Sequence, residues 1–290
     1  MKNQFNTLIL SFLVLTSCNF RKSANVDLLT GLSTRGDGLS CEEVYLSDGE
    51  TRLDRSKFTY GESIYMNFED IAGFAKQGDY AFPGLRLSLL GQDGDTVLKK
   101  EDLYAGNTDG FNFSPLILKA FLTLADPIHS GKEYALNVDI WDKMGKGTYR
   151  AKMNLEVVPD QKISLESQNV KWDEVYLFSG RDRRTITGDR ARFNDDIYLL
   201  FEGLEGFTPV DGKVYFDLSM KITDAAGKVY LDEPDLAGDE GMDTSDFRSQ
   251  VAPNFVISNP GVVNPVTCDV LIRDRNSESR IRATATVNLD

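Results

Sequence analysis

A single histidine limits the catalytic chemistry that this sequence can support. His129 lies in the segment DPIHSGKEY (126–134), and a Ser-His-Asp triad would have to use it. No GxSxG turn accompanies it, and a triad also requires a nucleophile and an acid in a defined geometry. We therefore interpret His129 as a residue of a surface loop.

Neighbouring carboxylates offer a second kind of chemistry, because glycosidases use two acids that flank a sugar. The adjacent pairs are Glu42–Glu43, Glu69–Asp70 and Asp195–Asp196. Consecutive side chains on a strand point to opposite faces of a sheet, so such pairs do not converge on one bond. The sequence also lacks a CxxC motif and any Cys/His spacing typical of zinc. We predict a protein that is not an enzyme and that uses no metal and no cofactor.

Trp141 is the residue whose type best suits ligand binding. It ends the stretch YALNVDIW (134–141), in which every second residue is apolar and belongs to a core face. Trp141, Asn137 and Asp139 then project from the opposite face. An exposed indole beside hydrogen-bonding side chains can stack on a sugar ring. The alternative is that the indole packs under a loop or at a domain junction, since large aromatic side chains are seldom left bare.

The segments that must position these residues occur twice in the sequence. Four segments of the first half have counterparts 131 to 133 positions later. The matched segments are SIYMNFEDIAGF (63–74) with DIYLLFEGLEGF (196–207), CEEVYL (41–46) with WDEVYL (172–177), DGDTVLKKEDL (93–103) with AGKVYLDEPDL (226–236), and NVDIWDK (137–143) with DVLIRDR (269–275). The period is too long for a solenoid unit, so the chain contains two tandem copies of one domain. A shared structural role explains why Glu69 and Glu202 recur.

Each copy has the pattern of β structure. Apolar and polar residues alternate in short stretches, which Gly- and Asp-rich turns such as GQDGD (91–95) separate. This predicts an all-β fold of two tandem, homologous antiparallel sandwiches with about seven strands each. The order of hairpins resembles that of immunoglobulin-like domains, although the Cys…Trp…Cys pattern of antibody domains is absent.

The bulk composition is that of a globular, acidic protein. The chain has 290 residues, of which 41% are hydrophobic and 27% charged, and its formal net charge is −13. Lys2 is the only charge before Cys18, so removal of residues 1–17 would leave −14. Such a charge repels phosphate backbones, and we see no basic stripe to offset it. We therefore do not expect nucleic acid as a partner.

The first eighteen residues, MKNQFNTLILSFLVLTSC, have the pattern of an export signal. A cation at Lys2 precedes an apolar stretch that is too short to span a bilayer, and small residues and Cys18 follow. The sequence Leu15-Thr16-Ser17-Cys18 resembles the lipobox of bacterial lipoproteins. This resemblance implies cleavage before Cys18, lipid on its thiol, and attachment to a membrane of the cell envelope.

The residues after Cys18 bear on the membrane leaflet. In Bacteroidota-type lipoproteins, which this chain resembles, acidic residues after the cysteine mark export to the outer face. The segment Asn19–Lys22 does not resemble that signal. We therefore expect an outer-membrane protein that faces the periplasm.

These observations predict the domain organisation and a function. The expected parts are a signal peptide (1–17), a flexible tether (18–40), a first sandwich (41–158), a linker (159–171) and a second sandwich (172–290). We expect Cys41 and Cys268 to remain unpaired, with Cys268 in the core. The predicted function is that of a lipid-anchored, non-catalytic binding or assembly module with an envelope protein as its partner. The alternative is a carbohydrate-binding surface lipoprotein that holds a glycan on Trp141.

Overall fold

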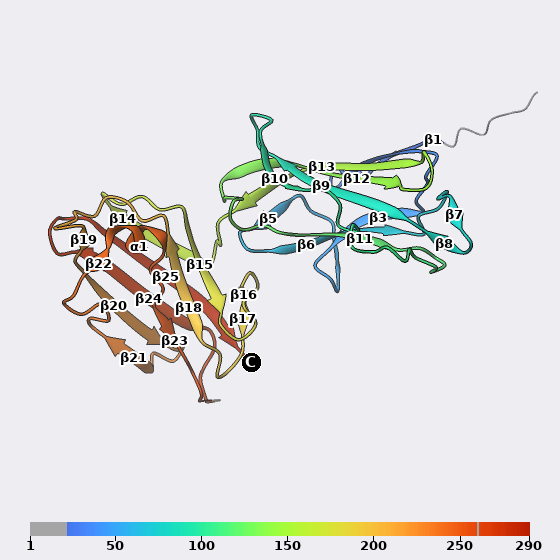
Figure 1. Cartoon of the computed structure of the whole chain (residues 1–290). Coiled ribbons are helices and arrows are strands. Elements are labelled where there is room, and N and C mark those ends of the chain that lie inside the picture. Colours follow the sequence, from blue (N-terminus) through green and yellow to red (C-terminus); the bar gives the residue numbers. More distant parts are fainter. Residues whose placement is uncertain (1–21, 260) are drawn as a thin grey trace, which may run out of the picture.

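Alternating apolar residues build two β-sandwiches that follow each other along the chain (Figure 1). The structure is a computed structural model, and it describes residues 22–259 and 261–290. The predicted signal peptide and Cys18 lie outside the described residues. The prediction of an all-β fold with two sandwiches is confirmed.

The first sandwich consists of two stacked sheets and a small hairpin. The larger sheet has the order β1-β2-β13-β12-β9-β10, and β5 pairs in parallel with the end of β13. The smaller sheet has the order β11-β6-β3-β4, and β7 pairs with β8. The strands are β1 (Lys22–Val26), β2 (Ser33–Asp37), β3 (Glu43–Ser47), β4 (Arg52–Leu53), β5 (Lys57–Thr59), β6 (Ser63–Glu69), β7 (Lys76–Gln77), β8 (Tyr80–Ala81), β9 (Pro83–Leu90), β10 (Thr96–Lys100), β11 (Leu118–Thr123), β12 (Lys132–Asp142) and β13 (Thr148–Val158).

The second sandwich repeats this arrangement. Its larger sheet has the order β14-β25-β24-β20-β21 with β17 parallel to β25, and its smaller sheet has the order β16-β15-β18-β23. A two-stranded sheet, β19 with β22, and one short helix complete it. The elements are β14 (Ile163–Gln168), β15 (Glu174–Ser179), β16 (Arg184–Thr185), β17 (Arg190–Ala191), β18 (Ile197–Glu202), β19 (Lys213–Val214), β20 (Phe216–Thr223), β21 (Val229–Glu233), β22 (Met242–Asp243), α1 (Thr244–Ser249), β23 (Asn254–Phe255), β24 (Val266–Asp274) and β25 (Arg280–Leu289).

The twelve-residue phrase that occurs twice in the sequence has the same structural role in both sandwiches. It forms β6 and β18, whose residues Phe68 and Phe201 are completely buried. The phrase then turns through Gly73 and Gly206, whose φ angles are +100° and +102°. A Cβ at either glycine would lie 2.3 Å or 2.0 Å from a backbone carbonyl oxygen. Only glycine fits this turn, which explains why it is kept in both copies.

The predicted boundaries of the two domains are wrong at their N-terminal sides. Part of the expected tether (18–40) forms the hairpin of β1 and β2, and β2 pairs with β13 of the first sandwich. Part of the expected linker (159–171) forms β14, which pairs with β25. β1 and β14 are edge strands, which need little apolar sequence because they pair on one side only. β2 pairs on both sides, with β1 and β13, but only Gly36 among its five residues is buried.

The cysteines lie as predicted, in separate sandwiches. Cys268 is 1% exposed in the second core, and Cys41 is half-buried beside the first core. Both thiols are free, so the prediction that they do not form a bridge is confirmed. Burial raises the pKa of each thiol to about 12. No helix in the described part of the chain is long and apolar enough to cross a membrane.

Candidate functional site

The residues predicted to bind a ligand lie together on the outer face of β12. Asn137, Asp139 and Trp141 are half-buried, and the residues between them are buried, as the alternation predicted. Trp141 lies opposite Gly84 of β9, and a Cβ on that glycine would lie 2.0 Å from the indole ring. The guanidinium carbon of Arg86 lies 5.8 Å from the ring centroid. The indole therefore packs against the neighbouring strand of its own sheet.

The polar members of this face are engaged in contacts of their own. The Asp139 carboxylate lies 3.0 Å from Nε of Arg150 on β13, and the Asn137 amide donates to the carbonyl of Ala135. A ligand on this face would meet the half-buried indole and the Asp139–Arg150 ion pair. The predicted ligand-binding role of Trp141, Asn137 and Asp139 remains a prediction.

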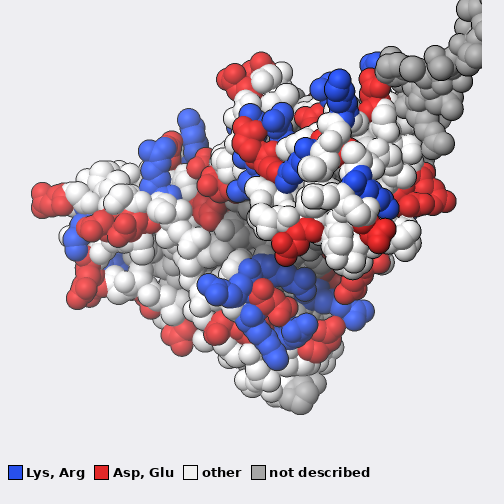
Figure 2. Space-filling model, turned by 45° about the vertical axis from the view of Figure 1, so that its right-hand side comes forward, with Lys and Arg blue, Asp and Glu red and all other residues white. Residues whose placement is uncertain are grey.

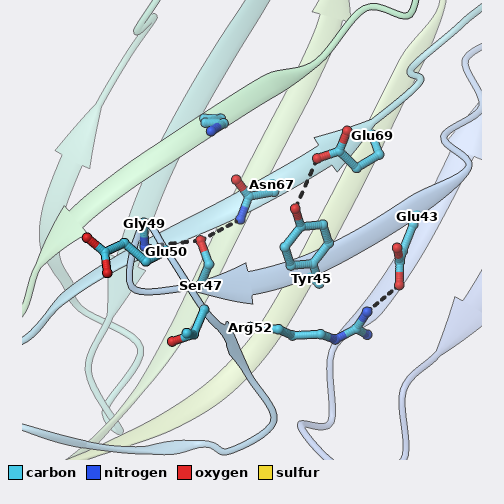
Figure 3. A pocket seen from close by; sticks show the side chains of 10 residues that line it. Glu43, Tyr45, Ser47, Gly49, Glu50, Arg52, Asn67 and Glu69 are labelled. Atoms are coloured by element: carbon cyan, nitrogen blue, oxygen red, sulfur yellow. Dashed lines mark hydrogen bonds and ion pairs between the residues drawn. The ribbon is translucent and has the colours of Figure 1, made fainter.

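A polar hollow opens on the smaller sheet of the first sandwich (Figure 3). Its volume is about 460 Å³. Its lining comes from β3, β4, β6, β11 and the β3–β4 turn, and comprises Glu43, Tyr45, Ser47, Gly49, Glu50, Thr51, Arg52, Asn67, Glu69 and Lys119. The Tyr45 hydroxyl donates to Oε1 of Glu69 at 3.0 Å, and the Asn67 amide donates to Oγ of Ser47 at 2.9 Å. Hydroxyl, amide and carboxylate groups thus converge beside a tyrosine ring.

The charge of this hollow determines what it can hold. Three glutamates face one arginine and one lysine, so the lining carries a net charge of −1. Arg52 forms an ion pair with Glu43 and lies over the Tyr45 ring. Desolvation, followed by the hydrogen bond to Glu69, raises the pKa of Tyr45, so its hydroxyl remains a donor. The hollow suits a neutral or cationic polar ligand better than an anion.

The second sandwich has the same tyrosine–glutamate hydrogen bond as this hollow, but there the first sandwich packs over the tyrosine. The Tyr176 hydroxyl donates to Oε1 of Glu202 at 2.6 Å, as Tyr45 does to Glu69 in the first copy. The predicted structural role of the recurring glutamates is confirmed, and the partner is a tyrosine on the adjacent strand. Tyr60 of the first sandwich packs on Tyr176, with 5.2 Å between the ring centroids.

This contact forms a junction between the sandwiches. Tyr176 and Leu200 of the second sandwich belong to the hydrophobic core cluster of the first. Glu174 is 2% exposed there, and the backbone N–H of Ser130 donates to its carboxylate at 2.6 Å. Burial is the main cause that raises the pKa of Glu174. The expected restriction on the relative orientation of the domains therefore has a physical basis in this buried contact.

His129 lies at the edge of the junction. Its Nδ1 atom is 3.9 Å from Oε1 of Glu174, and its side chain is 37% exposed. It belongs to a loop, as predicted, but no sequence pattern indicates that this loop meets the other domain. The described residues contain no group of three or more His, Cys, Asp or Glu side chains placed to hold a metal.

Basic residues gather on the second sandwich, although no basic stripe was predicted from the sequence. Figure 2 shows Lys and Arg side chains, interspersed with acidic ones, where the two sandwiches meet. The cleft there has a volume of about 610 Å³, and its lining includes Arg184, Arg190 and Arg192. Each of these arginines faces a carboxylate: Asp182 lies 3.7 Å from Arg184 and 3.1 Å from Arg192, and Asp290 lies 3.3 Å from Arg190. These charges are therefore largely neutralised within the protein.

A second group of arginines lies on the outer face of β24 and β25. Arg273, Arg280 and Arg282 line a shallow hollow of about 560 Å³ together with Glu166, Ser167, Gln168 and Leu271. Arg273 occupies the position that Trp141 occupies in the first copy. In the sequence, two arginines on alternate positions of one strand and a third just before the preceding turn would have indicated this cluster.

Comparison with known proteins identifies no family. No protein-family model matches the sequence, and no curated protein matches it. One solved structure with some likeness is pT26-6p, with 8% identity and a TM-score of 0.28, and the match covers 93% of this chain and 66% of that chain. A calcium-binding mutant of Bacteroides uniformis beta-glucuronidase 2 has 10% identity and a TM-score of 0.25, with 77% of this chain and 26% of that chain covered. A tetra-tandem repeat in the extending region of a large adhesion protein has 10% identity and a TM-score of 0.23, with 90% of this chain and 57% of that chain covered. This chain thus spans less than two thirds of each of them. TM-scores of this size carry no argument about function.

Proposed function

We propose that this protein is a lipid-anchored, non-catalytic binding or assembly module of the cell envelope. The observation that carries the proposal is the buried junction, which joins two sandwiches into one elongated unit. Two duplicated domains that shared only a flexible linker would display their surfaces independently. A junction with Tyr176 in the core of the neighbouring domain instead presents the outer faces of both at a defined relative angle.

The position of the anchor gives this unit a direction. Lys22 lies opposite Asp37, which lies opposite Thr148 at the start of β13. The other end of β13 leads to the second sandwich, and Figure 1 shows that sandwich at the end of the first one that is remote from β1. Four residues from Cys18 to Lys22 span at most about 14 Å. Lipid on Cys18 would therefore hold the first sandwich near the membrane and the second sandwich farther out.

The anchor is tested by metabolic labelling with a fatty acid and by membrane fractionation. Wild-type protein should incorporate the label and sediment with membranes, and the Cys18→Ala variant should do neither. Cys41→Ala is the matched control, because it removes another thiol and should leave both results unchanged. Equal labelling of wild type and Cys18→Ala would refute the anchor.

The binding or assembly role is tested by crosslinking in native membranes, followed by purification of the complexes. A stoichiometric envelope protein should copurify with wild type. Recovery of the chain alone at every crosslinker length would refute this role.

A second candidate function is glycan binding on the Trp141 face. The observation in its favour is the indole beside the Asp139–Arg150 pair on one open sheet face. Affinity electrophoresis of wild type and Trp141→Ala through gels that contain neutral polysaccharides tests it. Identical migration of both proteins in every gel would exclude this function.

A further inference from the structure

We propose that the outer face of β24 and β25 is a binding site for an acidic polysaccharide, with Arg273 and Arg280 holding its anionic group. We refer to Arg273, Arg280 and Arg282 as the arginine face. The site deepens the proposed binding function, because it names a surface and a ligand class. That this site lies on the sandwich farther from the membrane rests on the proposed anchor. The ability of the arginines to bind an anion does not depend on the anchor.

The first argument is the placement of two like charges against each other. Arg273 and Arg280 are direct cross-strand partners in the antiparallel pair of β24 and β25. Ile272 and Ile281 next to them are completely buried, so both arginines project outward from the sheet. Like charges directly opposite each other destabilise a sheet. A pair that opposes folding is expected where a ligand supplies the missing opposite charge.

The second argument is that neither arginine forms an ion pair: Asp217, the cross-strand neighbour of Arg273 on β20, is instead paired with Arg275 at 2.7 Å. Among the described residues, no carboxylate lies within 4.0 Å of the guanidinium of Arg273 or Arg280. The remaining residues, 1–21 and 260, include no Asp or Glu. Arg282 differs, because it forms a two-pronged contact with Asp269 at 2.9 Å. The arginine face thus has one neutralised guanidinium and two that are available to a ligand.

The third argument is the local charge in a chain that is acidic overall. The lining of this hollow has three arginines and one glutamate, which gives +2, whereas the whole chain carries −13. The hollow on the first sandwich carries −1 by the same count. An anion that is repelled from most of the surface is therefore attracted to the arginine face.

The lining also indicates what kind of anion fits. A planar guanidinium fork binds two oxygens of a carboxylate, sulfate or phosphate group at once. Leu271 provides an apolar surface for a sugar ring, and Ser167 and Gln168 provide hydrogen-bonding groups for hydroxyls. The lining contains no aromatic side chain on which a nucleic-acid base would stack. An acidic sugar combines the three chemical features that this face can recognise.

Affinity electrophoresis of the purified protein tests the site. The gels contain polygalacturonate, which presents carboxylates, dextran sulfate, which presents sulfates, or neutral dextran. We expect retardation in at least one acidic gel and none in the neutral gel. The acidic gel that retards the protein identifies the anionic group.

Two double variants distinguish a site from general charge attraction. R273Q/R280Q should weaken binding by about tenfold or more, because it removes two charge-assisted contacts. R184Q/R190Q is the matched control: it removes two exposed arginines from the same sandwich, and binding should remain within about twofold of wild type. Because Arg273 and Arg280 repel each other, the melting temperature of R273Q/R280Q should not fall below that of wild type.

Three results would overturn the proposal: no retardation in either acidic gel, full retardation of R273Q/R280Q, or equal loss of binding in both double variants. Binding of the wild-type protein to anionic vesicles is measured as a further experiment. If vesicles but not polysaccharides bound the arginine face, its ligand would be a lipid headgroup and the proposal would be wrong. Because none of these measurements depends on lipid at Cys18, a failure of the anchor is seen separately in the fatty-acid labelling.

Discussion

Truncation of Tyr176 should uncouple the two sandwiches without unfolding either of them. The Tyr176 side chain belongs to β15 of the second sandwich but packs in the core cluster of the first, where it is 9% exposed. Its ring lies against Tyr60, which is 4% exposed, and its hydroxyl bonds to Glu202. Loss of a buried aromatic side chain costs about 3–5 kcal/mol, of which about 0.5–1.5 kcal/mol comes from the paired rings. For Tyr176→Ala, most of this free energy should be lost from the junction.

The duplication supplies a matched control for this experiment. Tyr45 occupies the equivalent position in the first sandwich and makes the equivalent bond to Glu69, but it is half-buried and no domain covers it. Tyr45→Ala should therefore cost only about 1–2 kcal/mol, mainly for one hydrogen bond to a charged group and some buried area.

Urea unfolding and small-angle X-ray scattering measure the two consequences. We expect Tyr176→Ala to separate the unfolding of the sandwiches into two transitions and to broaden the distribution of interatomic distances. Tyr45→Ala should lower the urea midpoint slightly, but the number of unfolding transitions and the scattering curve should remain those of wild type. The reasoning would be refuted if both variants lost the same free energy, or if the scattering of Tyr176→Ala were identical to that of wild type.

Three further predictions concern single residues. Burial raises the pKa of Glu174 above its ordinary value of 4.5, so the folded state keeps this proton to higher pH than the unfolded state does. The stability of the wild type is therefore lost as pH rises from 4.5 through the raised pKa. In urea titrations, the stability of Glu174→Gln relative to wild type should increase with pH across that window. Gly206→Ala should lower the free energy of unfolding by about 2 kcal/mol or more, measured by thermal unfolding, because its Cβ would meet the carbonyl of Asn169. Gly227→Ala is the control: its φ is also positive, at +81°, but its Cβ would lie in open space, so the loss should be about 1 kcal/mol. Cys268 should resist alkylation at pH 8 in the folded protein and react after denaturation, as read by mass spectrometry, because burial raises its pKa to about 12; alkylation of the folded protein at the rate of the unfolded one would contradict its burial.

The strands of both sandwiches that carry the core could be predicted because each has one buried face. The stretch from Ser63 to Glu69 coincides with β6, and the stretch from Thr148 to Val158 coincides with β13. The edge strands β1 and β14, and β2 between β1 and β13, could not be predicted in this way. They are rich in Ser, Asn and Gly or in exposed polar residues, and their pairing depends on the neighbouring strand.

The contacts at the candidate sites depend on the register of strand pairing, which the sequence does not reveal directly. Alternation showed that Trp141 leaves the core face, but its contact with Gly84 depends on how β12 pairs with β9. In the same way, Arg273 and Arg280 become neighbours only because β24 and β25 pair at those positions. The junction was still harder to predict, because Tyr60 and Tyr176 are 116 positions apart and share no pattern.

The two copies of the smaller sheet show how a duplicated surface acquires different roles. Where the second sandwich has Leu200 and Phe178 under the junction, the first has Asn67 and Ser47, which bond to each other below the open hollow. If the hollow were also a docking face for a sandwich tip, the exposed charged side chains of its lining, Glu43, Arg52 and Lys119, would have to lose water, and this desolvation would weaken the contact. The charged lining therefore indicates a surface that is adapted to water and to polar ligands. This lining argues against an assembly in which further sandwiches dock one after another on this face. The hollow and the arginine face are then two separate surfaces for binding.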